Sequence, residues 1–291
     1  MKGDGEAAAR RGRQGLVLIK GAGELGSGVA WRLHRAGFGV VMTDREQPLA
    51  VRRTVAFCEA LALGEWTVEG VTARRAETPQ HARELLRSGV IPVLADPRAA
   101  CRTTLSPWAV VDAIMAKRNT GTSLADAPVV VALGPGFEAG VDCHAVVETH
   151  RGHFLGRVYY EGRALPDTGV PAERGGHGAA RVLRAPVAGV FWGVRRIGER
   201  VAPGEVVGHV HPKTPGGQAA AVSAAIGGVL RGLLRDGTEV PAGLKVGDVD
   251  PVAEPRWCFT ISDKALAVAG GVLEALLVLG GEARQRAAGP G

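Results

Sequence analysis

The sequence lacks the cysteine patterns that mark several common protein classes. Its 291 residues include only four cysteines, and no two of them have C-x-x-C spacing: Cys58, Cys101, Cys143 and Cys258. That spacing is typical of zinc fingers and thioredoxin-type redox sites, so we expect neither. Scattered cysteines in a chain of this length predict a reducing compartment, which here means the cytoplasm.

Signal-like and membrane-like segments are also missing. The N-terminus, MKGDGEAAARRGRQG, has no apolar segment, so we expect a disordered polar tail over residues 1–14 and no signal peptide. The most apolar stretch, residues 265–280, is short and contains Glu274, which favours a core helix over a membrane span. Aromatic residues make up 4% of the chain, and the net charge of +6 forms no basic stripe with interleaved aromatics. Nucleic-acid binding is therefore not expected.

A glycine-rich loop near the N-terminus is the strongest motif. An apolar run over residues 16–19 predicts a buried parallel strand, and Gly21, Gly23 and Gly26 follow it in G-x-G-x-x-G spacing. Helical apolar spacing comes next, and then a second strand that ends at Asp44. In this context the glycines permit a tight turn and close approach of a pyrophosphate, and the acid accepts hydrogen bonds from a ribose. We therefore predict a dinucleotide site that includes Glu24 and Leu25. Because Arg45 directly follows Asp44, the sequence fits NAD and NADP equally as ligands.

Further apolar runs alternate with helical segments as far as residue 133, including a predicted helix over residues 48–63. This alternation predicts an α/β fold, a Rossmann-like doubly wound parallel sheet that binds its ligand beyond the carboxyl ends of the strands. Asp96 and the turn Gly134, Pro135 and Gly136 follow two such strands, so we place them on the same rim as the glycine loop. The turn could present backbone N–H groups to an anion, or it could be a sharp chain reversal.

Reactive side chains are densest just after this turn. Cys143 and His144 are the candidate catalytic residues, because a histidine beside a cysteine can favour the thiolate, although Asp142 opposes this. A metal site built from Glu148 and the histidines His144, His150 and His153 is an alternative, and a polar strand edge is another. We predict no metal. A polar strand edge would give these side chains no chemical role.

The C-terminal half contains an internal repeat. Residues 185–210 match residues 224–249 at an offset of 39, with eleven of 26 positions identical. Short β-prone runs between glycines predict a β-rich barrel-sandwich unit similar to biotinyl and lipoyl carriers. In those carriers a lysine lies between the halves in a hydrophobic frame, whereas Lys213 lies between Pro212 and Thr214. We therefore expect a structural unit without a covalent cofactor.

These observations give a predicted domain order. A tail (1–14) precedes a Rossmann-like nucleotide-binding domain (15–145), a β-hairpin with a linker (146–183), a barrel-sandwich repeat domain (184–259), a C-terminal helix (260–280) and a second tail (281–291). Ser262 is the predicted N-cap of the helix.

Several long phrases carry a family resemblance over residues 16–279. They are GAGELGSGVAWRLHRAGFGVVMTD, RRTVAF, DAIMAKRNTGT, ALGPGFEAGVDCHAVVETHRGHFLGRV, KVGDVDP and ISDKALAVAGGVLEALL. With these phrases the chain resembles the YqeB-type accessory proteins of selenium-dependent molybdenum hydroxylases. The resemblance implies a cytoplasmic role in maturing a molybdenum hydroxylase. With it, the third phrase adds Lys117, Arg118 and Asn119 to the candidate cofactor-binding residues.

Three functions remain open at this point. The first is a maturation factor that holds a molybdopterin dinucleotide and assists insertion of sulfur or selenium, with Cys143 as the exchange residue exposed on the rim. The second is an NAD(P)-dependent oxidoreductase, for which a Tyr-x-x-x-Lys pair is missing. The third is a non-catalytic module that docks on the hydroxylase. The expected partners are the hydroxylase and its cofactor, with no nucleic acid and no membrane, and a homo-oligomer is left open.

Overall fold

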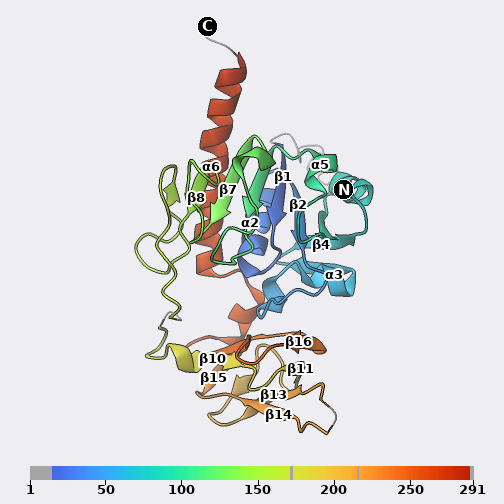
Figure 1. Cartoon of the computed structure of the whole chain (residues 1–291), viewed down its shortest axis with the longest axis vertical. Helices are drawn as coiled ribbons and strands as arrows, with labels where there is room; N and C mark the ends of the chain where they lie inside the picture. Colours follow the sequence, from blue (N-terminus) through green and yellow to red (C-terminus); the bar gives the residue numbers. More distant parts are fainter. Residues whose placement is uncertain (1–14, 171–172, 215, 289–291) are drawn as a thin grey trace. The chain divides into compact units, whose positions relative to one another are not determined.

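The computed structural model describes residues 15–170, 173–214 and 216–288, so the predicted tail 1–14 lies outside the described residues. The chain forms two compact units, which are described separately (Figure 1). The first contains the chain up to Pro48, Phe57–Asp167 and the chain from Ile261 onward; the second contains Leu49–Ala56 and Thr168–Thr260. These bounds differ from the predicted domains, because a short early segment joins the repeat and the C-terminal helix joins the first unit.

A nine-stranded sheet organises the first unit, in the order β3-β4-β5-β2-β1-β6-β7-β8-β9. The strands from β4 to β8 run parallel, while the edge pairs β3–β4 and β8–β9 are antiparallel. The bounds are β1 (Leu16–Lys20), β2 (Gly39–Asp44), β3 (Glu65–Val68), β4 (Val71–Ala76), β5 (Ile91–Ala95), β6 (Ala109–Asp112), β7 (Val129–Leu133), β8 (Ala145–Val147) and β9 (Val158–Tyr159).

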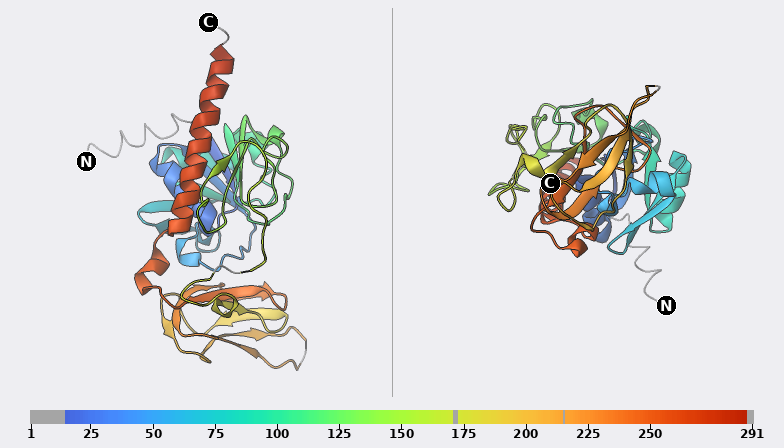
Figure 2. Two further views of the ribbon diagram at one scale, coloured as in Figure 1. Left: turned by 90° about the vertical axis from the view of Figure 1, so that its left-hand side faces the viewer. Right: turned by 90° about the horizontal axis from the view of Figure 1, so that it is seen from below.

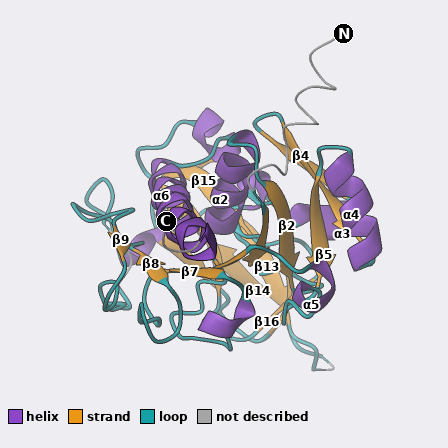
Figure 3. Cartoon of the chain, turned by 90° about the horizontal axis from the view of Figure 1, so that it is seen from above, coloured by secondary structure: helices purple, strands orange, loops and turns teal. Residues whose placement is uncertain are grey.

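Two helices far apart in sequence cover one face of this sheet. α2 (Glu24–Arg35) and α6 (Asp263–Ala288) lie side by side (Figure 3). Gly28 allows their close approach, since a Cβ there would lie 2.8 Å from the Cβ of Ala265. On the other face, α4 (Pro79–Arg87) and α5 (Arg102–Leu105) pack against the apolar side chains of β1, β2, β5 and β6, and α3 (Glu59–Leu63) packs beside β3 to β5.

The predicted fold class is wrong. The sheet is mixed, and the connections from β6 to β7 and from β7 to β8 contain only one short 3-10 turn, η2 (Leu124–Asp126), in place of crossover helices. The apolar side chains of β7 and β8 are covered instead by the loop around Phe137 and Cys143 on one face and by α6 on the other. A doubly wound sheet requires helices from its own crossovers on both faces, and this half of the sheet has none.

Two local expectations also differ from the structure. The predicted helix over residues 48–63 is replaced by a 3-10 turn, η1 (Arg53–Val55), and by α3, because Leu49–Ala56 packs in the second unit. The β-hairpin expected in residues 146–183 begins earlier, since β8 (Ala145–Val147) pairs antiparallel with β9 across the loop 148–157.

The C-terminal helix begins as predicted but is longer. Ser262 Oγ accepts the N–H of Ala265 at 3.2 Å, which confirms its N-cap role. The helix runs to Ala288 and so takes in most of the predicted tail 281–291; residues 289–291 lie outside the described residues. Figure 2 shows α6 running along the first unit and past its sheet. By length and composition, the helical stretch Pro255–Gly281 could cross a membrane, because an 18-residue window within it has a mean hydropathy of 1.7. However, 44% of this window is buried, and the core helix of a soluble protein gives the same signal.

The second unit contains two four-stranded sheets, ordered β10-β17-β15-β12 and β14-β13-β11-β16. All pairings within them are antiparallel. The bounds are β10 (Val182–Arg184), β11 (Gly189–Gly193), β12 (Arg200–Val201), β13 (Val206–His211), β14 (Ala220–Ser223), β15 (Gly228–Leu233), β16 (Thr238–Val240) and β17 (Lys245–Asp250), with the 3-10 turns η3 (Ala179–Arg181) and η4 (Pro255–Phe259) beside them.

The internal repeat explains this arrangement strand by strand. At the offset of 39, β10 to β13 correspond to β14 to β17, and each sheet takes two strands from each copy. Phe191 and its equivalent Leu230 are both fully buried in one shared core. Neither copy buries its apolar face alone, which is the reason the two pack as one unit. The unit differs from the predicted barrel-sandwich domain 184–259, since it also contains Leu49–Ala56 and the chain from Thr168 onward. Lys213 forms an ion pair with Glu239 at 2.6 Å.

Candidate functional site

The glycine loop, residues 21–26, connects β1 to α2 by a turn that only glycine fits. Gly21 has a φ of +95°, and its N–H donates to the carbonyl of Thr43 at 2.8 Å. A Cβ at Gly26 would lie 2.0 Å from the carbonyl oxygen of Gly21. The first and third glycines of the motif are therefore required by the turn itself.

The second glycine has a different environment. Nothing lies within 4 Å of a Cβ built on Gly23, and α2 begins after it without a side-chain cap. The Glu24 carboxylate is held at the start of α6, where Ser262 Oγ donates to it at 2.8 Å. Leu25 follows in the first turn of the helix. The helix N-terminus therefore faces open space beside Gly23, as a phosphate site requires.

Asp44 lies at the end of β2, beside the loop. Its two carboxylate oxygens accept the N–H groups of Ala22 and Arg45, each at 2.8 Å. Burial raises the pKa of Asp44, while these two hydrogen bonds act in the opposite direction. Each oxygen keeps a second lone pair, so the carboxylate can still accept a hydrogen bond from a ribose.

Asp96 follows β5, whose last residue pairs with Asp44 in the sheet register. Its carboxylate accepts the N–H of Cys101 at 2.7 Å and so closes the turn before α5. The two acids and the glycine loop thus lie at the carboxyl ends of adjacent strands. We call this surface, residues 21–26, 44, 96 and the loop 113–122, the carboxyl rim.

The sequence reading missed a buried polar cluster beneath the carboxyl rim. Lys20 and Asp112 are direct neighbours in the register of β1 and β6, and their charged groups lie 3.5 Å apart. Thr122 connects them, because its hydroxyl accepts from the Lys20 ammonium and donates to the Asp112 carboxylate at 2.5 Å. All three are at most 5% exposed. The sequence did contain one sign of this cluster, since each of two apolar strands ends in a charged residue, β1 in Lys20 and β6 in Asp112.

The loop 113–122 contains the three residues added by resemblance. Lys117 forms an ion pair with Asp167 at 2.8 Å, and Arg118 is exposed. The side-chain oxygen of Asn119 accepts two backbone N–H groups of its own loop, and its amide donates to Asp142 at 3.0 Å. Asn119 therefore fixes the shape of the loop, and the loop presents the cation of Arg118 to solvent.

The turn at residues 134–136 offers fewer backbone N–H groups to an anion than expected. The N–H of Gly134 already donates to Val147 at 2.8 Å, and Pro135 has none. Gly136 has a φ of +103°, and a Cβ there would lie 2.5 Å from the backbone of Arg118. The turn is therefore a chain reversal against which the loop 113–122 packs, and neither Gly134 nor Pro135 offers an N–H group to an anion.

Cys143 and His144 are not arranged as a nucleophile and its base. Cys143 is fully buried, and burial together with the nearby Asp142 raises the pKa of its thiol to about 12. Nδ1 of His144 accepts the N–H of Val130 at 3.0 Å, so this nitrogen is engaged with the backbone of β7. The predicted exposure of Cys143 on the rim is wrong, since its side chain belongs to the cluster that covers β7 and β8.

The alternative metal site also lacks its ligands. Both oxygens of Glu148 are engaged by backbone N–H groups, those of His150 at 2.7 Å and Leu165 at 2.8 Å. Within residues 15–170, 173–214 and 216–288, no group of three or more His, Cys, Asp or Glu side chains could hold a metal ion. Glu148 instead fixes the loop between β8 and β9.

A curated relative matches most of the chain. It is the "Uncharacterized protein YqeB" of Escherichia coli (strain K12), 49% identical over 264 residues, which are 91% of this chain and 48% of the relative. The chain thus spans about half the length of this relative. The resemblance to YqeB-type proteins is confirmed, and the printed name assigns no activity. No family model matches the chain.

Solved structures give weaker matches. An aspartoacylase family protein from Mesorhizobium loti is 14% identical, with a TM-score of 0.28, and covers 84% of this chain and 88% of that one. A succinylglutamate desuccinylase from Silicibacter sp. is 14% identical, with a TM-score of 0.27, and covers 82% of this chain and 85% of that one. At TM-scores this low, neither match carries an argument about fold or activity.

Proposed function

We propose that this chain, which is 49% identical to a YqeB protein over 91% of its own length, is a cytoplasmic accessory protein for the maturation of a molybdenum hydroxylase. In this role its carboxyl rim binds a nucleotide-bearing cofactor, a molybdopterin dinucleotide in the first instance. The resemblance supports the maturation role, and the glycine loop supports the ligand class.

The open space beside Gly23 is the observation that carries the ligand proposal. The N-terminal turn of α2 offers backbone N–H groups and a partial positive charge there, and no Cβ blocks the approach. Glu24 would repel a phosphate if it pointed inward, but its carboxylate is held by Ser262 at 2.8 Å. The phosphates would therefore lie against residues 23–26.

Two other groups of the carboxyl rim fit the rest of such a ligand. Asp44, beside the loop, accepts hydrogen bonds from a ribose, and the exposed Arg118 offers a cation to a second phosphate. The buried Lys20 and Asp112 hold the ends of β1 and β6 in register beneath the loop and have no contact role in this proposal. The buried Cys143 has no part in it either.

Mass spectrometry of the small molecules released on denaturation tests this proposal. The protein, purified without added nucleotide from cells that make the cofactor, is expected to release a pterin dinucleotide. A Gly23→Val variant should release much less, while Gly270→Ala, a change in α6, should release the same amount. Release of NAD(H) or NADP(H), with turnover of a small molecule, would contradict the maturation role and favour an oxidoreductase. Binding of the hydroxylase by a chain that carries no nucleotide would instead favour a docking module.

A further inference from the structure

The two sheets of the second unit have equivalent outer faces, because the internal repeat places the same strand positions in both. Val210 of β13 and its equivalent Val249 of β17 are buried in the shared core. Side chains alternate along a strand, so the residues on either side of each valine point outward. At the offset of 39 these residues are His209 and His211 in β13, and Asp248 and Asp250 in β17.

The outer face of the sheet β10-β17-β15-β12 is covered by other segments of the same unit, and we call it the covered face. Arg52, from the segment Leu49–Ala56, lies 3.1 Å from Asp248, and Arg174, from the segment before η3, lies 2.8 Å from Asp250. Asp248 is 2% exposed and Asp250 0%. Two segments outside the sheets thus bring arginines onto the two acids of this face.

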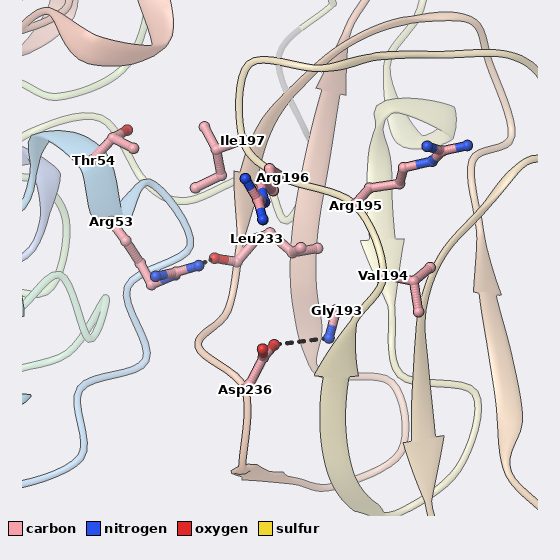
Figure 4. Close-up of a pocket in the computed structure, with 9 residues that line it drawn as sticks. All are labelled: Arg53, Thr54, Gly193, Val194, Arg195, Arg196, Ile197, Leu233 and Asp236. Atoms are coloured by element: carbon pink, nitrogen blue, oxygen red, sulfur yellow. Dashed lines mark hydrogen bonds between the residues drawn. The ribbon is translucent and has the colours of Figure 1, made fainter.

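The outer face of the sheet β14-β13-β11-β16 is not covered in this way. Trp192 of β11, opposite His209 in the register, is 49% exposed, and His211 is exposed as well. The end of β11 is fixed, since the N–H of Gly193 donates to the Asp236 carboxylate at 2.8 Å in the pocket beside it (Figure 4). We call this second surface the open face; it consists of Val190, Trp192, His209, His211, Ala221 and Glu239.

The open face presents hydrogen-bond donors where the covered face presents acids. Within the described residues, no hydrogen bond or ion pair engages the rings of His209 and His211, whose centroids lie 6.4 Å apart. Each imidazole offers an N–H group in either protonation state, and the indole of Trp192 offers another. The carboxylate of Glu239 is already paired with Lys213 at 2.6 Å. The surface is therefore complementary to hydrogen-bond acceptors, of which carboxylates are the strongest.

A pocket of about 410 Å³ adjoins the open face at Glu239. Ala188, Pro212, Val240 and Pro241 are among the residues that line it. The pocket follows the end of β13, so it lies next to His211 along the strand. It can receive an apolar side chain at that end of the face.

From this arrangement we propose that the open face binds an extended, acidic segment of a partner protein, in the way that the covered face binds the arginine-bearing segments of this chain. Two residues of an extended chain span about 6.6 Å, close to the separation of the two histidine rings, so acids two residues apart reach both rings. Trp192 supplies the aromatic contact beside them. The surface lies within the second unit and does not depend on the proposed function.

Fluorescence polarisation with the full chain tests the surface with two probes. The first is a short labelled peptide with aspartate, aspartate and leucine at alternate positions, and the second has asparagine in place of both aspartates. The acidic peptide should bind about tenfold or more tightly, the difference expected for charge-assisted hydrogen bonds. His209→Gln with His211→Gln should weaken the acidic peptide about tenfold, and Trp192→Ala should weaken both peptides. His153→Gln removes an exposed histidine of the first unit and should change neither affinity.

The comparison of the two peptides needs no variant, so equal affinities would overturn the proposal directly. It would also be overturned by equal effects of the double histidine variant and His153→Gln, or by no binding of either peptide at about 1 mM, a weak affinity for a specific site. Loss of peptide binding in EDTA would show that the histidine pair holds a metal ion instead. A dimer that Trp192→Ala dissociates in sedimentation would make a second copy of this chain the occupant, which also contradicts the proposal.

Discussion

Gly23 and Gly26 are three residues apart in the glycine loop, and the structure separates their roles. A Cβ on Gly26 would lie 2.0 Å from the carbonyl oxygen of Gly21, whereas a Cβ on Gly23 meets nothing within 4 Å. Gly26→Ala should therefore destabilise the protein by about 2 kcal/mol or more, because the turn must shift to admit the methyl group. Gly23→Ala is the matched control and should stay within about 1 kcal/mol of the wild type. Urea unfolding measures both, and equal losses would contradict this reading.

Lys20 and Asp112 form the other residue-scale feature that can be tested. Lys20→Met removes the cation and leaves a buried carboxylate, which should cost about 3–5 kcal/mol. Thr122→Val removes the bridging hydroxyl only and should cost about 1–3 kcal/mol. The double variant Lys20→Met with Asp112→Leu should recover part of the loss, since no unpaired charge remains. If the double variant is as unstable as the sum of its single variants, the two groups are not coupled.

At the scale of elements, α6 contains two adjacent glycines with opposite environments. A Cβ on Gly270 meets nothing within 4 Å, while a Cβ on Gly271 would lie 2.3 Å from the carbonyl oxygen of Gly156. Gly270→Ala should stabilise the protein by about 0.5–1 kcal/mol through helix propensity. Gly271→Ala gains the same propensity but forces α6 away from the loop before β9, so its net effect should be a loss. Thermal unfolding of the two variants gives the sign of each change, and a gain in both would show that α6 does not pack closely there.

The elements that were correctly predicted from the sequence are those determined by patterns of neighbouring residues. β1, α2, β2 and the turn between them follow from an apolar run, three glycines and an acid, and the repeat follows from identities at one offset. The errors are long-range. Residues 48–63 have helical apolar spacing, but Val51 accepts the N–H of Leu233 within the second unit, and this pairing replaces the first part of the helix. The apolar spacing of α6 gave a helix but could not show that it covers β7 and β8 in place of crossover helices.

The candidate site shows the same limit. The sequence placed the glycine loop, Asp44 and Asp96 at strand ends, and the register confirms that they are neighbours. It could not show that Lys20, Asp112 and Thr122 meet, because their sequence separations exceed any local motif. The burial of Cys143 was also hidden, since it depends on a loop that folds back over β7 and β8.

At the scale of the whole molecule, the charges of the second unit make its stability depend on pH. Burial opposes ionisation of Asp248 and Asp250. At Asp248 the charges of Arg52 and Lys245 outweigh burial, and at Asp250 the N–H of Val252 together with Arg231 and Arg174 does so, so both pKa values lie below the ordinary 3.8. The unfolded chain therefore binds protons first as the pH falls. This contribution to stability is complete above about pH 5 and is lost as the pH falls through 4 toward the folded-state values.

Urea unfolding between about pH 6 and pH 2.5 measures this dependence over the range in which carboxylates titrate. Asp250→Asn should be less stable than the wild type at pH 6 and should lose less on acidification. Glu254→Gln removes a half-exposed carboxylate of the same unit and should keep the wild-type slope. Identical slopes in the wild type and Asp250→Asn would show that the buried aspartates are not the source.

The central claim is that the carboxyl rim binds a nucleotide through the glycine loop, and calorimetry of nucleotide binding to Gly23→Val tests it most directly. NAD, NADP and nucleoside diphosphates are titrated into the wild type, Gly23→Val and the control Gly270→Ala. The account predicts that at least one nucleotide binds the wild type and the control equally, and that Gly23→Val weakens it about a hundredfold or more, because a branched side chain occupies the space of the phosphates. Equal affinity in the wild type and Gly23→Val would contradict it.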